Sequence, residues 1–386
     1  MSKGKLLIFG PINDFGGREI EAGFIAYALS SEYEVAICST ESLGKQSQVF
    51  TFNPNQEAFA LNQMLCKKHV WIRLLALFNR LNNGGKGSLS KFAQNSISKK
   101  YFGYKKKAKR VLHELLAQQD LIFICGQLSS NYVSDVVKFA KKNNKKLIFR
   151  TTGTISNPTH YSYLDKIDCF IHHSASNAGK IDHLPDYKYE IIDQCAFNET
   201  ELSKLRPHEN NCQKFLVLTR LSPEKGVEQI IDYFLRCCAP DDVLYIAGNG
   251  SLETLLKNKF QQRNIRFLGF VESDEFVRVF ADIDCLIIPS PEESGPLVGV
   301  EAMCAGKVII STVVGAMPER LSGTLNDFWY ECDNFESFAE VFQNVKQLTE
   351  SERMMIFKSL TDRYHSEYTI QKIGRKYLNI VKKIMA

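Results

Sequence analysis

A repeated rhythm governs what this chain can fold into: short apolar runs, each followed by a Gly- or Pro-containing loop and then by a helical pattern. The first run is Leu6–Phe9, and a loop ending in Gly16-Gly17 follows it. A helical pattern then extends from about Arg18 to Ser30, and the next apolar run is Val35–Cys38. Strand, loop, helix and strand in this order predict the beginning of a parallel α/β domain. Further strands predicted in the first half are Leu121–Cys125, Leu147–Phe149, Cys169–His172 and Tyr189–Ile192.

The same rhythm resumes after a polar stretch at residues 199–213, whose composition is typical of a linker. The strands predicted beyond it are Phe215–Leu218, Val243–Ala247, Ile265–Leu268, Cys285–Ile288 and Val308–Ser311. A chain of 386 residues is long for one core and fits two domains. We therefore expect one α/β domain over residues 1–200, a second over 201–365, and a last helical segment over 366–386.

Composition excludes several protein classes. The chain has no run of about 18 uncharged apolar residues, so we expect no membrane-spanning helix. The N-terminal segment lacks the apolar core and the cleavage site of a signal peptide. Eleven cysteines are scattered without a Cys-x-x-Cys pair, and several lie in predicted strands. Buried free thiols in a reducing cytoplasm are expected, rather than a disulfide framework or a zinc site.

The positive charge of the chain is concentrated in one block. Residues 67–110 hold thirteen Lys or Arg and no Asp or Glu, whereas the whole chain has a formal net charge of +5. Aromatic residues are interleaved in this block, as in Lys99-Lys100-Tyr101-Phe102-Gly103-Tyr104-Lys105-Lys106-Lys107. Three interpretations are open: a solvated helical face over a core, docking to an anionic membrane surface, and nucleic-acid binding, although no nucleic-acid-binding module accompanies the block.

The stretch from Pro289 to Met303 combines features of a site for an anionic ligand. It follows a buried strand, contains two carboxylates in a loop, and continues into a helix that we expect Pro296 to open. The first backbone N–H groups of a helix have no partner within it, and they form an anion site together with the helix dipole. The stretch therefore places Glu293 beside a predicted phosphate site, with Glu301 about two helical turns further on.

The spacing Glu293-x7-Glu301, with Gly295-Pro296-Leu297 inside it, resembles the retaining family-4 glycosyltransferases of the GT-B fold. Two more segments resemble that family: Thr219-Arg220-Leu221-Ser222-Pro223-Glu224-Lys225-Gly226, and the loop from Val314 to Glu319. The family's usual Glu-Gly-Phe-Gly-Leu is here Glu293-Ser294-Gly295-Pro296-Leu297, and Thr219 replaces a Gly. The specific motifs cover residues 213–320, and the resemblance of the first 200 residues is only architectural.

The resemblance implies a fold of two Rossmann-like domains with parallel sheets facing a central cleft, and a last helix that crosses back to the first domain. It implies a nucleotide-sugar donor bound by the second domain and an acceptor on the side of the first. Glu293 would contact the donor sugar near its reacting carbon, and Glu301 would bind the ribose hydroxyls. The donor-binding residues implied are Arg220, Lys225, Gly295, Pro296, Leu297, Val298, Glu301, Gly16, Gly17 and Val271.

No metal or other cofactor is expected, because cations and N–H dipoles can stabilise a leaving diphosphate. Asp282-Ile283-Asp284 matches a metal signature of another glycosyltransferase fold but lies between a predicted helix and a strand. His172 and His173 are neighbours in a predicted strand and so point to opposite faces. The family often has a His after the strand at Leu147–Phe149, where this chain has Arg150 and hydroxyl residues.

The predicted function is transfer of a sugar from a UDP- or GDP-sugar to a glycan or a lipid-linked glycan, as in the synthesis of bacterial capsule, O-antigen or lipopolysaccharide. No nucleic acid is expected among its partners. The predicted location is the cytoplasm, peripherally on the inner face of the membrane, with Lys99, Lys100, Lys105, Lys106 and Lys107 on the membrane or acceptor surface. Two alternatives stay open: a nucleotide-sugar epimerase of the same fold, and a non-catalytic partner that binds a nucleotide sugar.

Overall fold

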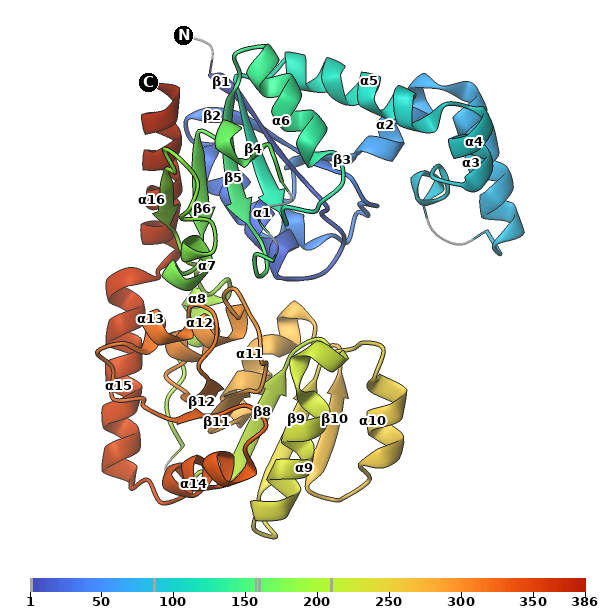
Figure 1. The fold of residues 1–386 in the computed structure, drawn as a ribbon. Helices are drawn as coiled ribbons and strands as arrows, with labels where there is room; N and C mark the ends of the chain where they lie inside the picture. Colours follow the sequence, from blue (N-terminus) through green and yellow to red (C-terminus); the bar gives the residue numbers. More distant parts are fainter. Residues whose placement is uncertain (1–2, 86–87, 157, 159–160, 209–210) are drawn as a thin grey trace. The chain divides into compact units, whose positions relative to one another are not determined.

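A computed structural model describes residues 3–85, 88–156, 158, 161–208 and 211–386 (Figure 1). The chain divides into two compact units. The first extends from the N-terminus to Ile192 and includes Gly374–Ala386, and the second is Asp193–Ile373. The boundaries expected from the sequence, at residues 200 and 365, each lie eight positions from the ends of these units, Ile192 and Ile373.

The first unit is built on a seven-stranded parallel sheet of order β3-β2-β1-β4-β5-β6-β7. Its strands are β1 (Gly4–Gly10), β2 (Tyr33–Ser39), β3 (Glu57–Ala60), β4 (Leu121–Gly126), β5 (Lys146–Thr151), β6 (Cys169–His172) and β7 (Tyr189–Ile191). The predicted strands of this part recur within about two residues at each end, and β3 was not predicted. Its sequence, Glu-Ala-Phe-Ala, is too short and too weakly apolar to indicate a strand by itself.

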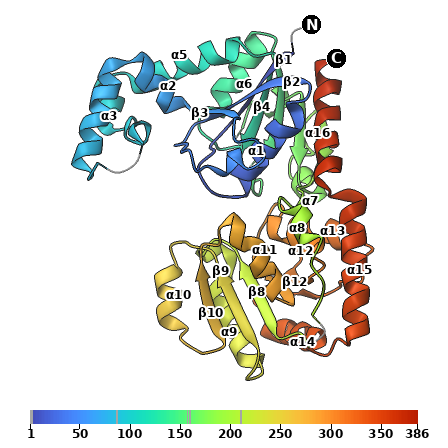
Figure 2. The same ribbon diagram turned by 180° about the vertical axis from the view of Figure 1, so that it is seen from behind.

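The helices of this unit are α1 (Gly17–Leu29), α2 (Leu61–Lys68), α3 (Val70–Asn82), α4 (Ser96–Tyr101), α5 (Tyr104–Ala117), α6 (Val133–Lys142) and α7 (Ala175–Gly179). Some of them cover the two faces of the sheet, whereas α3 and α4 stand to one side of it (Figure 1). Helix α6 lies in front of the sheet in Figure 1, and α1 lies in front of it in the reverse view of Figure 2. Because both faces are covered, four successive residues of β1, Leu6 to Phe9, are all buried.

The apolar residues between Leu61 and Leu81 recur at a helical spacing, but the segment is not one continuous helix. The chain forms α2 and α3 with a break at His69, whose backbone is extended (φ −130°, ψ 98°). Helices α4 and α5 follow, and α5 buries an apolar face while most of its lysines are exposed. An apolar periodicity alone did not reveal the break, because His69 is neither Gly nor Pro.

The second unit contains a six-stranded parallel sheet of order β10-β9-β8-β11-β12-β13. Its strands are β8 (Lys214–Leu218), β9 (Val243–Ala247), β10 (Ile265–Gly269), β11 (Cys285–Ile288), β12 (Val308–Thr312) and β13 (Trp329–Tyr330). The order reverses at β8, because the chain adds β9 and β10 on one side and then β11 on the other. In open parallel sheets such a reversal, at the carboxyl ends of the strands, is where ligands bind.

The helices of the second unit are α8 (Glu199–Leu202), α9 (Val227–Cys237), α10 (Glu253–Lys259), α11 (Ser273–Asp282), α12 (Leu297–Cys304), α13 (Met317–Leu321), α14 (Phe335–Lys346) and α15 (Glu350–Glu367). Helix α8 forms inside the segment predicted as a linker. The last helix, α16 (Ile370–Met385), belongs to the first unit from Gly374 onward, and Tyr377 on it packs against Phe24 of α1 and Phe123 of β4.

The cysteines are unpaired, and most of them are buried. All eleven cysteines are free, and eight of them are buried. Burial raises the pKa of the Cys38 thiol to about 12, so this thiol stays protonated and inert near neutral pH. Among the described residues, no helix has both the length and the apolar character needed to cross a bilayer.

Candidate active site

The loop that joins β8 to α9 is pressed against the end of β11. It contains one helical turn, Pro223–Lys225, and then Gly226 in the left-handed region (φ 67°). A Cβ atom on Gly226 would lie 2.5 Å from the carbonyl oxygen of Pro289, so only glycine permits this approach. The close approach brings the residues before Gly226 to the loop that follows β11.

Two predicted site residues meet at this point. The Lys225 ammonium and the Glu293 carboxylate form an ion pair although they are 68 positions apart in the sequence. Ser290 Oγ donates to Glu293 Oε1 at 3.0 Å, which fixes the carboxylate further. Both charged side chains are 18% exposed, so the pair is only partly shielded from solvent and open to a ligand.

The start of α12 is held from behind by a buried guanidinium. Arg320 has no exposed surface, and its Nη1 donates to the Pro296 carbonyl oxygen at 2.5 Å. The same side chain makes a two-pronged contact with Asp193 at 2.8 and 2.6 Å. On the other side, Gly315 (φ 54°) packs so closely that a Cβ there would lie 2.8 Å from the backbone of Ser294. The turn before α12 is thus fixed by two neighbouring segments.

We expected Pro296 to be the first helical residue of α12. In the structure it is instead the N-cap, one position before the helix. The helix begins at Leu297, and the N-cap makes no side-chain hydrogen bond to the first turn. The reason is that the Pro296 backbone is extended (φ −64°, ψ 112°). The first-turn N–H groups of a helix, here those of Leu297 and Val298, are the donors that an anionic ligand can use.

Glu301 lies one helical turn further along α12 and is 6% exposed. Burial raises the pKa of its carboxyl to about 8, and the Arg320 charge opposes this rise only in part. The carboxyl is therefore mostly protonated at neutral pH. A protonated carboxyl can donate one hydrogen bond and accept others, which suits contact with vicinal hydroxyl groups.

The remaining residues predicted for the second unit lie on the same carboxyl edge of its sheet or close to it. Arg220 follows β8 and is exposed. Gly295 is half-buried in the turn before α12. Val271 follows β10 and is half-buried beside a hollow of about 620 Å³, which lies along α11 and includes Tyr245, Leu268 and Val279 in its lining.

In the first unit, the predicted loop residues Gly16 and Gly17 mark the start of α1. Gly16 is the N-cap (φ 139°), and its N–H donates to Gln48 Oε1 at 2.8 Å. The next residue, Arg18, donates from Nε to Thr152 Oγ1 at 2.9 Å and so joins the loops after β1 and β5. These contacts place both glycines at the carboxyl edge of the first sheet.

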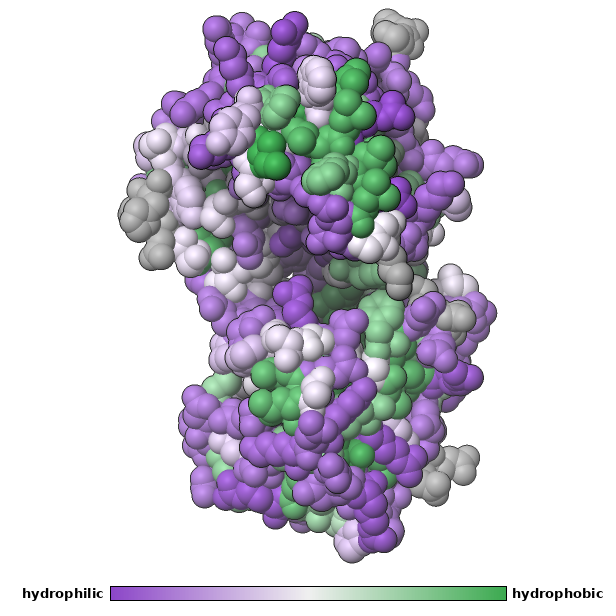
Figure 3. Space-filling model, turned by 90° about the vertical axis from the view of Figure 1, so that its right-hand side faces the viewer, coloured by the Kyte–Doolittle hydropathy of each residue, from purple (hydrophilic) through white to green (hydrophobic). Residues whose placement is uncertain are grey.

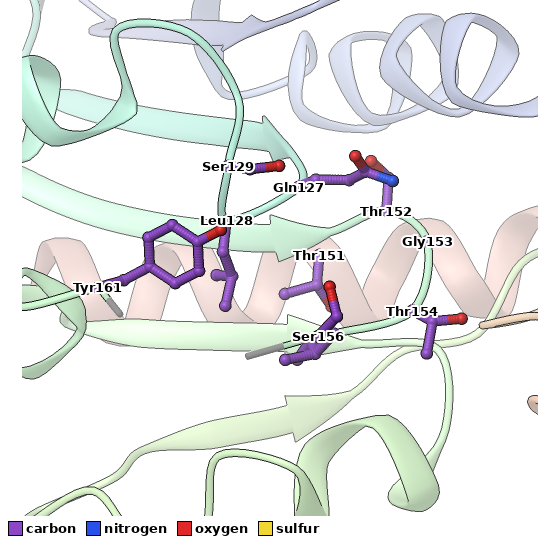
Figure 4. Close-up of a pocket in the computed structure, with 10 residues that line it drawn as sticks. Gln127, Leu128, Ser129, Thr151, Thr152, Gly153, Thr154, Ser156 and Tyr161 are labelled. Carbon is purple, nitrogen blue, oxygen red and sulfur yellow. The ribbon is translucent and has the colours of Figure 1, made fainter. Parts of the chain in front are cut away.

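A small polar hollow of about 60 Å³ lies at the ends of β4 and β5 (Figure 4). Its lining is rich in hydroxyl and amide groups and includes one aromatic ring: Gln127, Ser129, Thr151, Thr152, Thr154, Ser156 and Tyr161. Hydroxyl and amide side chains without a net charge are suited to a neutral polyhydroxylated ligand. His160, which also follows the strand β5 in the sequence, lies outside the described residues.

Arg150, which occupies the region where the family has a His, does not line this hollow. It is fully buried and donates from Nε and Nη2 to Glu21 Oε1 at 2.8 and 2.6 Å. His173 Nε2 lies 3.2 Å from the other oxygen of Glu21, and the Tyr377 hydroxyl donates to Glu21 at 3.1 Å. The cluster connects α1, β5, the end of β6 and α16. No sequence pattern revealed it, because its members are scattered from position 21 to position 377.

The acidic and histidine pairs that superficially suggested metal have protein partners. Asp282 pairs with Lys214, and Asp284 contacts His208 at 2.6 Å and accepts two backbone N–H groups. His172 is hydrogen-bonded to Thr151 and Tyr187, and burial lowers its pKa to about 3. Among the described residues, no group of three or more His, Cys, Asp or Glu side chains could hold a metal ion.

Sequence reasoning missed the residues that support the site. Arg320 and Asp193 anchor the turn before α12, and Ser290 orients Glu293. The only available signal was that Arg320 directly follows the Pro-Glu of a segment already singled out. An Arg in a helix is ordinarily a surface residue, so its complete burial could not be anticipated.

Comparison with known proteins agrees with this geometry. Residues 198–359 match the model of the family described as glycosyl transferases group 1. An uncharacterized glycosyltransferase of Methanocaldococcus jannaschii is 27% identical over 175 residues, which are 44% of this chain and 45% of the relative. A 41.2 kDa protein in the cps region of Klebsiella pneumoniae is 23% identical over 221 residues, 55% of this chain and 58% of the relative. The chain thus spans about half the length of these curated relatives.

A solved structure extends the likeness to both units. The crystal structure of Anabaena Alr3699/HepE in complex with UDP-glucose has a TM-score of 0.71 to this chain at 15% identity, and the alignment covers 98% of this chain and 99% of the other. At this identity the likeness shows the fold, which is the GT-B fold predicted from the sequence. The chain therefore has the GT-B fold, and its residues 198–359 match the glycosyl transferases group 1 family.

Proposed function

We propose that this protein transfers a sugar from a nucleoside diphosphate sugar to a glycan or a lipid-linked glycan, with retention of the anomeric configuration. The observation that carries the proposal is the Lys225–Glu293 pair beside the start of α12, at the carboxyl edge of the second sheet. The family match over residues 198–359 includes all of these residues. The Anabaena protein, which shares the fold, was crystallised in complex with a nucleotide sugar, UDP-glucose.

In this proposal the second unit holds the donor. The diphosphate accepts hydrogen bonds from Lys225, Arg220 and the first N–H groups of α12, which together offset the negative charge that develops on the leaving phosphate. Lys225 then exchanges its contact with Glu293 for a contact with phosphate. Glu293, relieved of its partner, faces the donor sugar, and the protonated carboxyl of Glu301 contacts the ribose hydroxyls.

The proposed contribution of each motif differs. Gly295 and Pro296 shape the turn, Leu297 and Val298 supply N–H groups, and Val271 borders the base. In the first unit, the loop at Gly16 and Gly17 and the polar hollow of Figure 4 are proposed to serve the acceptor side. No metal ion has a role in this scheme, because the positive charges and N–H groups named here act on the diphosphate.

We further propose that the acceptor belongs to a surface polysaccharide pathway and that the protein acts in the cytoplasm, peripherally on an anionic membrane surface. Two observations support this: a relative named for a cps region, and the acid-free block of thirteen cations. Lys99, Lys100, Lys105 and Lys106 are exposed, and Lys107 is half-buried. Free cysteines agree with a reducing compartment.

The donor is tested by thermal unfolding with UDP-glucose and GDP-mannose. A donor present at 100 times its dissociation constant stabilises the folded state by about 2.7 kcal/mol. We expect one nucleotide class to raise the melting temperature, and NMR of the product to show retention. Absence of stabilisation by both would contradict the proposal.

Variants separate the alternatives. Glu293→Gln is expected to keep donor binding and to lose transfer. A non-catalytic binding partner would bind donor without turnover in either form, and an epimerase would yield an epimer without any acceptor. Replacing Lys105, Lys106 and Lys107 with Ser tests the membrane surface, since unchanged sedimentation with anionic vesicles would count against it.

A further inference from the structure

Helix α3 presents an apolar face outward. Six apolar side chains on it are between 43% and 67% exposed: Val70, Trp71, Leu74, Leu77, Phe78 and Leu81. Their spacing places them within an arc of about 120° on one side of the helix. We call these six residues the apolar stripe. Figure 3 shows hydrophobic residues gathered on the face of the first unit that carries α3.

Residues on the opposite side of α3 are buried and hold the helix in place. Ile72 and Ala76 are completely buried, and α3 packs against α2, α4 and the short helix Leu89–Phe92. The stripe is therefore not a core face, since the helix is held in place by other residues. Exposed apolar residues are ordinary when scattered, but a continuous stripe of this kind marks an interaction surface.

The surroundings of the stripe identify its partner. Residues 67–110, which include α3, hold thirteen cations and no acidic residue, and three of these cations pair with Glu114 or Asp135 further along the chain. Helix α4 lies beside α3, with the rings of Trp71 and Phe102 6.4 Å apart, and it carries Lys99 and Lys100. Neither of these lysines makes an ion pair with a described residue. A second copy of the chain would bring two such cationic surfaces together, which like-charge repulsion disfavours.

We propose that α3 is an interfacial membrane helix whose apolar stripe inserts into the leaflet of an anionic bilayer while the neighbouring cations contact the lipid headgroups. Helices that combine an apolar face with Lys and Arg lie in the plane of the membrane and bury that face roughly 5–10 Å deep. Trp71 has the amphipathic ring that is favoured at this depth. The inference deepens the membrane part of the proposed function and is independent of the donor site.

Tryptophan emission tests insertion directly. The chain has two tryptophans, Trp71 and Trp329, so Trp329→Phe leaves Trp71 as the only emitter. With vesicles of phosphatidylcholine and phosphatidylglycerol we expect a blue shift, and quenching by lipids brominated on their acyl chains. With phosphatidylcholine alone we expect little change. An unchanged emission spectrum for vesicle-bound protein would mean that the lysines bind headgroups without insertion, and this would overturn the proposal.

Sedimentation with the same vesicles provides the matched variants. Leu74→Ser with Phe78→Ser is expected to lower the partition coefficient at least about tenfold, because two apolar side chains no longer enter the leaflet. Met354→Ser with Met355→Ser is the control, since these residues of α15 are exposed to a similar extent, 48% and 49%. Equal binding by the α3 variant and the wild type would refute the proposal.

Two further measurements distinguish membrane insertion of the stripe from dimerisation and from an effect on donor binding. If the wild type is a dimer in solution, does not bind vesicles, and becomes a monomer in the α3 variant, then the stripe belongs to a second copy and the proposal fails. Donor stabilisation measured without vesicles is expected to be equal in the α3 variant and the wild type. A loss of vesicle binding with intact donor binding therefore tests the stripe alone.

Discussion

Two buried glutamates, one in each unit, have opposite protonation. Glu21 on α1 is 2% exposed, but Arg150, His173 and Tyr377 surround its carboxylate, and the two cationic partners hold its pKa below its usual range despite the effect of burial. Glu301 on α12 is 6% exposed, and burial raises its pKa to about 8 because only the charge of Arg320 opposes it. Burial therefore does not determine the charge of a carboxyl; the cations within reach do.

The difference indicates distinct tasks. The Glu21 carboxylate is occupied by hydrogen bonds that tie α1, β5 and α16 together, so it is a structural centre of the first unit. The Glu301 carboxyl makes no hydrogen bond or ion pair with a described residue, and it is available for a ligand. Variants at these positions and at their neighbours can test whether the contrast holds, and they differ widely in the size of effect expected.

Removing the cation beside Glu21 should have the largest effect. Arg150→Met leaves a buried carboxylate without its main partner, which costs about 3–5 kcal/mol of the free energy of unfolding. Urea unfolding at pH 7 measures this loss. The double variant Glu21→Gln with Arg150→Met removes both charges and should recover part of it. A loss below about 1 kcal/mol in the single variant would mean that the cluster is not a structural centre.

The charge state of Glu301 is tested by pH. Because its pKa is raised in the folded state, the stability that its neutral form provides is present below about pH 4.5 and is lost as pH rises toward 8. The glutamine of Glu301→Gln cannot ionise. The free energy of unfolding of this variant should therefore exceed that of the wild type by an amount that grows between pH 5 and pH 8.5, to the order of 3 kcal/mol. Unfolding of both proteins at the two pH values checks this.

For Glu21 we expect the opposite pH dependence of its contribution to the free energy of unfolding. Its pKa is lowered in the folded state, so its contribution is present above the unfolded value of about 4.5 and is lost as the pH falls below it. The difference in stability between the wild type and Glu21→Gln should therefore shrink on acidification. A pair of variants with the same pH dependence would contradict the assignment of opposite charges.

Lys225 contrasts with both glutamates because its role is proposed to concern the ligand. Lys225→Met should weaken binding of the nucleotide sugar about 10- to 100-fold, equivalent to losing one hydrogen bond between charged groups. Calorimetric titration measures this, and Lys257→Met is the control, since that exposed lysine pairs with Glu253 within α10. Equal weakening by the two variants would point to a general charge effect.

The smallest loss of stability is expected for a substitution of Tyr377, the remaining partner of Glu21. Tyr377→Phe removes one hydrogen bond to a carboxylate that keeps its two cationic partners, and it should lower the free energy of unfolding by about 1 kcal/mol. Thermal unfolding of the full chain checks it. No change in donor affinity is expected, because Tyr377 belongs to the first unit.

Much of the fold was accessible from local patterns. Apolar runs bounded by turn residues form the strands β1, β2, β4 to β6 and β8 to β12. Such runs can be recognised as strands from the local sequence alone. The short strand β3 and the break at His69 were missed, because their residues are compatible with several backbone conformations. The membrane-facing interpretation of the basic block stayed one of three, since a sequence does not tell which side of a helix faces outward.

Strand periodicity was enough to predict a two-domain parallel α/β protein, and the resemblance of its motifs to a glycosyltransferase family implied Lys225, Glu293 and Glu301 as site candidates. The folded arrangement was needed to find that Arg320 supports the turn before α12, that Glu21 and Glu301 differ in charge, and that the apolar face of α3 is left uncovered. These properties depend on which residues from distant segments surround a side chain, and burial and Coulomb interactions act through space and not along the chain.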